Sequence, residues 1–185
     1  MPDFEIIAFD APGNGSSEGD LSNLLLFILA IKAVITFHGK PDVVIGHSLG
    51  AMANIAALGE LGITPSILIS VTPLLRLKEN FEFSMNKVGI PLPDQTTYFD
   101  SFKEKFDIPI SDFKLDNWYG FNNKVNHWLA YDVNDPIAPH TYLETFAASY
   151  PSVKLKNYTD IGHHNAIKSP VVVSDLVQEV ISAVA

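Results

Sequence analysis

The chain has 185 residues, which is enough for one domain with a proper hydrophobic core. Its 12 basic and 21 acidic residues give a net charge of −9, which argues against binding to nucleic acids or to anionic membranes. The absence of cysteine excludes disulfides, thiolate catalysis and cysteine-ligated metals. No signal peptide is recognisable at the amino terminus, so we expect a cytoplasmic protein.

Strand-like and helix-like segments alternate along the chain, which predicts a mostly parallel sheet with helices on both faces. The predicted strands comprise residues 5–9, 42–45, 66–71, 125–131 and 153–158. The predicted helices comprise residues 21–38, 51–59, 141–149 and 171–184. A polar loop rich in glycine, serine, asparagine and aspartate, residues 10–20, follows the first strand. The order of the segments therefore indicates an α/β fold.

The segment from Leu24 to Phe37 is apolar except for Lys32 and Thr36. Its 14 residues are too few to span a bilayer, and Lys32 interrupts the apolar run. We therefore expect a helix that is buried against the sheet or against a neighbouring subunit.

Between residues 72 and 124 the alternation breaks. This stretch is rich in phenylalanine, aspartate, lysine and proline, and it contains helical pieces near residues 75–87 and 94–106. It offers no strand to extend the sheet. We predict that it forms a cap, a helical insertion above the sheet of a single domain that comprises residues 1–185.

A short strand and an alanine-rich helix enclose the motif Gly46-His47-Ser48-Leu49-Gly50. It reads G-x-S-x-G, the pattern of a nucleophile elbow, in which a strained turn projects the serine hydroxyl from the sheet edge. We expect that the glycines two residues before and two after Ser48 must lack side chains, so that the helix can pack closely. The Leu49 backbone amide, at the start of this helix, is the expected oxyanion-hole donor.

Asp135 and His163 each follow a predicted strand, at the edge of the sheet where Ser48 should project. In this arrangement His163 would take the Ser48 proton and return it to the leaving group, while Asp135 would orient the imidazole. Each of the three residues, taken alone, also has a non-catalytic interpretation. The serine could simply cap a helix, the aspartate could form a turn, and the histidine could be a solvated loop residue. Their combination in the order Ser, Asp, His favours the catalytic interpretation.

Two neighbouring side chains remain rivals for these roles. His164 is an alternative base, and Asp132 is an alternative acid that lies closer to the strand end. We prefer His163 because it directly follows Gly162, and Asp135 because it leads into a proline-rich turn. Metal binding by His163 and His164 is the weaker interpretation, since neighbouring ring nitrogens rarely converge on one ion and no acidic cluster completes a site.

Four motifs resemble those of the α/β-hydrolase superfamily, in its lipase, esterase and proline-iminopeptidase-like branch. They are, in chain order, Asp10-Ala11-Pro12-Gly13-Asn14-Gly15-Ser16-Ser17, the elbow, Asn134-Asp135-Pro136-Ile137-Ala138-Pro139 and Gly162-His163. The resemblance implies a catalytic triad of Ser48, His163 and Asp135 that needs neither cofactor nor metal. It implies a carboxylesterase-like serine hydrolase for an ester, thioester or amide of a small, partly apolar substrate.

The amino terminus departs from the family's pattern. In the family the D-x-P-G-x-G-x-S loop follows the fourth strand, whereas here it follows the first predicted strand, residues 5–9. The resemblance thus implies that three strands and the His-Gly loop, which supplies a second oxyanion amide, have no counterpart. We expect impaired activity, and an exposed edge at residues 5–9 that pairs with a second copy in a homodimer or with a missing amino-terminal segment.

Two other functions remain open at this point. One is a non-catalytic α/β-hydrolase-like binding domain or an inactive fragment, and the other is a cofactor-free haloperoxidase or lyase with the same triad. A dinucleotide-binding fold is disfavoured, because Glu18 stands where the third glycine of G-x-G-x-x-G would be.

Overall fold

Four parallel strands form one sheet through the centre of the molecule, in the order β1-β2-β3-β4. The structure is a computed structural model, and it describes residues 4–121 and 125–184. The strands are β1 (Val43–His47), β2 (Ile67–Val71), β3 (Asn126–Asp132) and β4 (Val153–Tyr158). The predicted α/β fold with a mostly parallel sheet and flanking helices is thereby confirmed.

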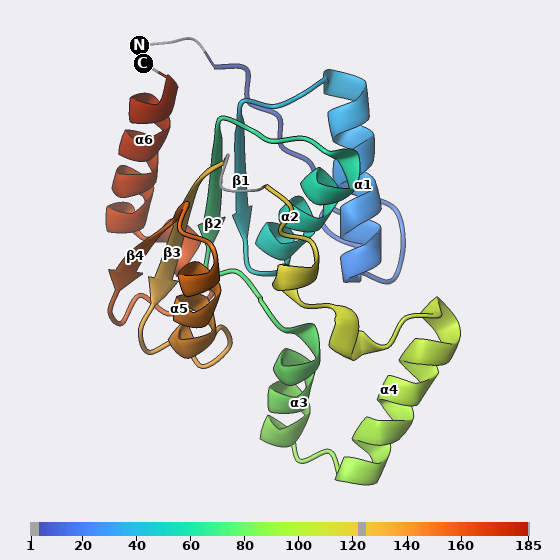
Figure 1. The fold of residues 1–185 in the computed structure, drawn as a ribbon. Coiled ribbons are helices and arrows are strands. Elements are labelled where there is room, and N and C mark those ends of the chain that lie inside the picture. The colour runs from blue at the N-terminus through green and yellow to red at the C-terminus, as the bar shows by residue number, and fades with distance from the viewer. Residues whose placement is uncertain (1–3, 122–124, 185) are drawn as a thin grey trace.

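Helices cover both faces of this sheet (Figure 1). The flanking helices are α1 (Leu24–His38), α2 (Leu49–Leu61), α5 (His140–Ser149) and α6 (Pro170–Val184). Because side chains alternate between the faces of a strand, each strand contributes to two cores. Leu68 and Leu129 join a large core with α1, α2 and α5, whereas Ile67, Ile69 and Trp128 join a smaller core with α6.

The apolar helix α1 begins with an asparagine cap, because the Asn23 side chain accepts a hydrogen bond from the Leu26 amide. It buries a stripe at helical spacing that consists of Leu24, Ile28, Ile31 and Ile35. The stripe packs against α2. Phe37, outside the stripe, is 84% exposed. Within the described part of the chain, no helix is both long and apolar enough to cross a membrane.

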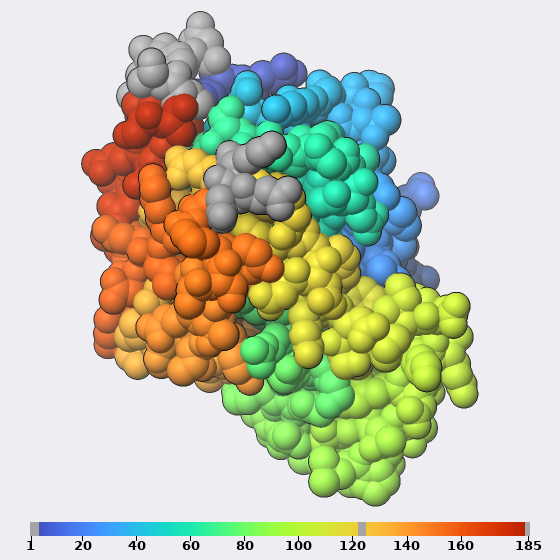
Figure 2. Space-filling view, in the orientation of Figure 1, coloured from blue at the N-terminus to red at the C-terminus, as the bar shows by residue number. Residues whose placement is uncertain are grey.

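Two helices of the predicted cap, α3 (Leu77–Lys87) and α4 (Leu92–Phe106), lie beyond the carboxyl ends of the strands (Figure 1). Figure 2 shows this segment as a lobe that projects from the rest of the molecule. Aromatic contacts join the two helices, with 5.6 Å between the ring centroids of Phe81 and Tyr98. The short turns η1 (Ile110–Asp112) and η2 (Leu115–Asn117) lead back to the sheet, and η3 (Ala166–Lys168) precedes α6. The predicted end of the cap, residues 122–124, lies outside the described residues.

The predicted strand at residues 5–9 is wrong, because these residues have no regular secondary structure. The backbone N–H and C=O groups of a strand need hydrogen-bond partners on a neighbouring strand. The nearest candidate is β1, which among the described residues pairs only with β2. A cavity of about 400 Å³ is lined by this segment, by α1 and by β1. The segment stays exposed, and Ile6 is 85% accessible to solvent.

A histidine lies inside the large core. His127 of β3 is fully buried, with its Nδ1 3.0 Å from the Tyr119 hydroxyl and its Nε2 2.9 Å from Ser70 Oγ. Burial lowers the pKa of His127 from 6.5 to about 3, so the folded protein holds this imidazole neutral. The unfolded chain binds a proton at this histidine below pH 6.5, which the folded chain does not bind.

The free energy of unfolding should therefore fall as the pH drops from 6.5 towards 3, by up to about 1.4 kcal/mol per pH unit from this group. His127→Gln should flatten the pH dependence over this range, whatever its effect on stability at neutral pH. Urea denaturation between pH 4.5 and 7 measures the slope. His38→Gln, which removes an exposed histidine, is the control. Equal slopes in His127→Gln and the wild type would contradict the assignment.

Candidate active site

The elbow serine lies in a strained turn between β1 and α2. Ser48 has φ 52° and ψ −122°, a conformation with positive φ that non-glycine residues rarely adopt. Its amide donates a hydrogen bond to the Val71 carbonyl of β2 at 3.0 Å. Its carbonyl accepts from the amides of Met52 and Leu74 at 3.3 and 3.4 Å. The sheet and α2 together hold the strained residue in place.

The two glycines of the elbow have different roles. A Cβ at Gly46 would lie 2.6 Å from the Ala51 Cα and 2.6 Å from Asn54 Nδ2, so α2 passes too close for any side chain. A Cβ at Gly50 would meet no atom within 4 Å. The expectation that both positions exclude a side chain is therefore right for Gly46 and wrong for Gly50, which faces open space.

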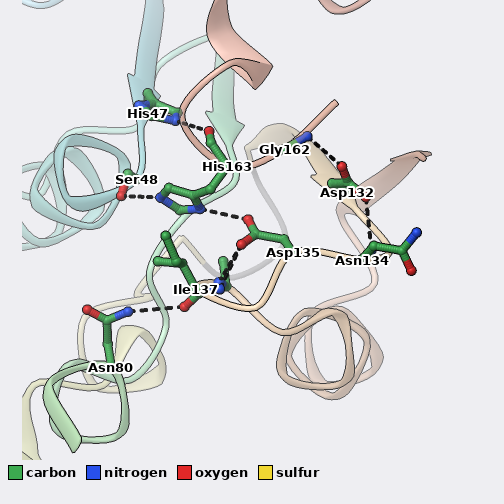
Figure 3. A network of polar contacts seen from close by, with 10 residues as sticks. His47, Ser48, Asn80, Asp132, Asn134, Asp135, Ile137, Gly162 and His163 are labelled. Carbon is green, nitrogen blue, oxygen red and sulfur yellow. Dashed lines mark hydrogen bonds and ion pairs between the residues drawn. The ribbon is translucent and has the colours of Figure 1, made fainter. Parts of the chain in front are cut away.

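The structure brings the three predicted catalytic residues together in one chain of hydrogen bonds (Figure 3). The Ser48 hydroxyl donates to His163 Nε2 at 2.8 Å. On the other side of the ring, His163 Nδ1–H donates to Asp135 Oδ2 at 2.6 Å. His163 and Asp135 are both buried, whereas Ser48 is partly accessible. This arrangement can move a proton from the serine to the imidazole.

The loop after β3 keeps Asp135 ionised. Its Oδ1 accepts hydrogen bonds from the Ile137 and Ala138 amides at 2.8 and 3.1 Å. Burial by itself would raise the pKa of Asp135, but the hydrogen bonds from His163 and the two amides outweigh it and hold the pKa below its usual value. A carboxylate in this state can orient His163 and stabilise its protonated form.

The rival residues make different contacts. His164 is exposed, and its ring centroid lies 5.2 Å from that of His163 in an edge-on arrangement. Asp132 is buried, and its carboxylate accepts from the backbone amides of Asn134 and Gly162 at 2.8 and 2.7 Å. The geometry thus pairs His163 with Asp135 and gives Asp132 a different set of partners.

A metal site has little support in this region. Both ring nitrogens of His163 already take part in hydrogen bonds, to Asp135 and to Ser48. In residues 4–121 and 125–184, no three histidine or acidic side chains are grouped so that they could hold an ion.

A second histidine at the site was not singled out in the sequence, because it occupies a variable position of the G-x-S-x-G pattern. His47 Nε2–H donates to the His163 backbone carbonyl at 2.8 Å (Figure 3). Burial lowers the pKa of His47, although the carbonyl opposes the shift. Through this hydrogen bond the neutral ring of His47 stabilises the backbone position of His163.

An apolar cleft of about 460 Å³ lies beside the elbow, between the start of α1, the start of α2 and the helices α3 and α4. Leu49, the residue after Ser48, forms part of its wall. Most of the remaining wall is apolar and includes Phe81, Phe102 and Phe113, while Ser101 and Lys105 add polar groups. A cleft of this kind suits the apolar part of a small ligand.

A sequence model of the Alpha/beta hydrolase family matches residues 2–174. The chain therefore belongs to the alpha/beta hydrolase family, as the motifs indicated, and membership supports a hydrolase. The sequence has no significant match among curated proteins.

Several solved structures share this fold. The mouse alpha/beta hydrolase domain-containing protein 10 matches with a TM-score of 0.64 and 15% identity, over 95% of this chain and 77% of the mouse protein. BpoC from Mycobacterium tuberculosis, proposed to be a non-heme bromoperoxidase, matches at 0.62 and 16%, over 96% of this chain and 81% of BpoC. Est1E from Butyrivibrio proteoclasticus, solved with ferulic acid, matches at 0.58 and 17%, over 93% and 76%. At these identities the comparison shows the fold alone.

Alanine substitutions at the two elbow glycines should have opposite effects. Gly46→Ala should destabilise the protein by about 1–3 kcal/mol, because the new methyl group overlaps the α2 backbone and must displace it. Gly50→Ala should be neutral or stabilise by up to about 1 kcal/mol, because it adds a better helix former where there is space. Chemical denaturation of both variants measures the difference. Equal losses would show that α2 does not approach the elbow as the structure has it.

Proposed function

We propose that this protein is a serine hydrolase of the carboxylesterase type, with Ser48 as nucleophile, His163 as general base and Asp135 as the residue that orients it. The observation that carries the proposal is the unbroken hydrogen-bond chain, with 2.8 Å from Ser48 Oγ to His163 Nε2 and 2.6 Å from His163 Nδ1 to Asp135 Oδ2. A serine hydroxyl is a weak nucleophile until a base of this kind accepts its proton.

The reaction would follow two steps. Ser48 Oγ attacks the carbonyl carbon of the substrate while His163 Nε2 takes the hydroxyl proton, and the imidazolium then gives it to the leaving alcohol, thiol or amine. A water molecule then gives a proton to His163 and attacks the acyl carbon, the bond from this carbon to Ser48 Oγ breaks, and His163 returns the proton to Ser48 Oγ as the acyl group leaves as a carboxylic acid. Asp135 stays ionised and stabilises the imidazolium in both steps.

The developing oxyanion needs hydrogen-bond donors. The Leu49 amide is the proposed donor, because Leu49 is the first residue of α2 and the amides at a helix start have no partner within the helix. The positive end of the α2 dipole would add to the stabilisation.

The cleft beside Leu49 suggests the substrate class. Its volume of about 460 Å³ and its aromatic and aliphatic wall fit a small acyl or aryl group. We therefore propose an ester, thioester or amide of a small, partly apolar acid.

A fluorophosphonate probe tests the nucleophile directly. At neutral pH it should form one covalent adduct with the wild-type protein, located on Ser48 by peptide mass spectrometry, and none with Ser48→Ala. Ser149→Ala, which removes an exposed hydroxyl on α5, should label like the wild type. Equal labelling of wild type and Ser48→Ala would reject Ser48, and no labelling at all would favour a non-catalytic binding domain.

The choice between the two histidines has its own test. His163→Ala should lower the turnover of a p-nitrophenyl ester by about 10²–10⁴-fold, because it removes the general base. His164→Ala should stay within about two-fold of the wild type, because it removes an exposed side chain. Initial rates over a range of ester concentrations give both values. A larger loss in His164→Ala than in His163→Ala would reverse the assignment of the base.

A further inference from the structure

The catalytic acid and base lie on two separate loops, one after β3 and one after β4 (Figure 3). Asp132, the last residue of β3, lies between these loops and is only 1% exposed. Its Oδ1 accepts the Asn134 amide at 2.8 Å, in the loop of Asp135. Its Oδ2 accepts the Gly162 amide at 2.7 Å, directly before His163. Each oxygen of one buried carboxylate therefore holds one of the two loops.

Burial of this carboxylate is costly unless its charge is compensated. Among the residues that the structure describes, no lysine or arginine forms an ion pair with Asp132. The charge of Asp132 is instead stabilised by the two backbone amides, since hydrogen bonds to a charged acceptor are stronger than those between neutral groups. Because the two amides belong to different loops, both bonds form only when the loops lie in the right relative position.

The other links between the loops lie farther from the histidine in the sequence. The Val133 amide donates to the Tyr158 carbonyl at 3.0 Å and extends the pairing of β3 with β4. Asn134 Nδ2 donates to Asp160 Oδ1 at 3.0 Å, but this contact is exposed and competes with water. Of these contacts, only the Asp132 bond reaches the residue next to His163.

The loop before His163 contains one strained residue. Asp160 has a left-handed conformation with φ 57°, whereas Gly162, with φ 71°, adopts such a conformation without steric cost. A left-handed conformation costs free energy in a non-glycine residue, so surrounding contacts must stabilise it. Asp132 holds the loop on one side of His163, through the Gly162 amide, and His47 holds it on the other, through the His163 carbonyl.

We propose that Asp132 is a positioning residue, which ties the loop of the acid to the loop of the base and thereby sets the hydrogen bond between His163 and Asp135. This inference rests on the proposed serine hydrolase function. Asp132→Asn keeps the shape but offers one acceptor oxygen, and its NH₂ group would face a backbone N–H. One loop would lose its bond, and a displacement of about 1 Å at a catalytic group can cost about 10²-fold in rate.

The test compares the wild type with Asp132→Asn, Asp132→Glu and the control Asp175→Asn. Asp175 of α6 also accepts hydrogen bonds, from the Tyr158 hydroxyl at 2.7 Å, but it touches neither loop residue of the triad. Two readouts are used: kcat and KM for p-nitrophenyl butyrate, and the low-field proton NMR signal of His163 Nδ1–H in its bond to Asp135. Thermal unfolding verifies that each variant is folded.

Asp132→Asn should lower kcat by about 10²-fold with KM within about two-fold, and should weaken or shift the low-field signal. Asp132→Glu, which keeps both charged acceptors, should recover part of both. Asp175→Asn should match the wild type. A folded Asp132→Asn protein with wild-type kcat and an unchanged signal would overturn the proposal.

Two complications are covered by the same set of variants. If Asp132→Asn does not fold, Asp132→Glu decides. Its extra methylene group displaces the two acceptor oxygens, so its kcat should lie between that expected for Asp132→Asn and the wild-type value, with a shifted signal. Wild-type kcat with an unchanged signal in that variant would show that the exact position of these oxygens does not matter and would overturn the proposal. If the wild type shows the low-field signal but no labelling of Ser48, the serine hydrolase function fails. The effect of Asp132→Asn on the signal then still tests whether Asp132 positions His163.

Discussion

The hydrogen bond from Ser48 to His163 joins residues that are 115 positions apart in the chain. It depends on the way in which the strands pair in the sheet. It forms because β1, β3 and β4 run parallel and end at one edge of the sheet, so the loops after them meet. A shift in the pairing of any strand would move one loop relative to the others. The register of the sheet is therefore the structural basis of the site.

The elbow strand is itself at an edge of the described sheet, since β1 pairs only with β2. Part of its outer side is covered by α2, where Asn54 Nδ2 donates to the Ile45 carbonyl at 3.1 Å. The same helix approaches Gly46 closely and supplies the Leu49 amide. The packing of α2 on β1 thus links the stability of an edge strand to the geometry of Ser48.

The sequence predicted the parts of the fold and site that depend on local patterns. The elbow, β2 to β4 and the order of Ser48, Asp135 and His163 all have such patterns. The strand predicted at residues 5–9 is wrong because an apolar segment becomes a strand only where a neighbour takes its backbone hydrogen bonds. The space at Gly50 and the contacts of Asp132 could not be read from the sequence either, because both depend on how distant segments pack.

A crystal structure of the protein after reaction with a small alkyl phosphonate would test the central claim most directly. Our account predicts a phosphorus–oxygen bond to Ser48 Oγ, with His163 still paired to Asp135 and a phosphonyl oxygen within hydrogen-bond distance of the Leu49 amide. The alkyl group should enter the apolar cleft beside Leu49. An adduct on another residue, or a phosphonyl oxygen directed away from the start of α2, would contradict the account.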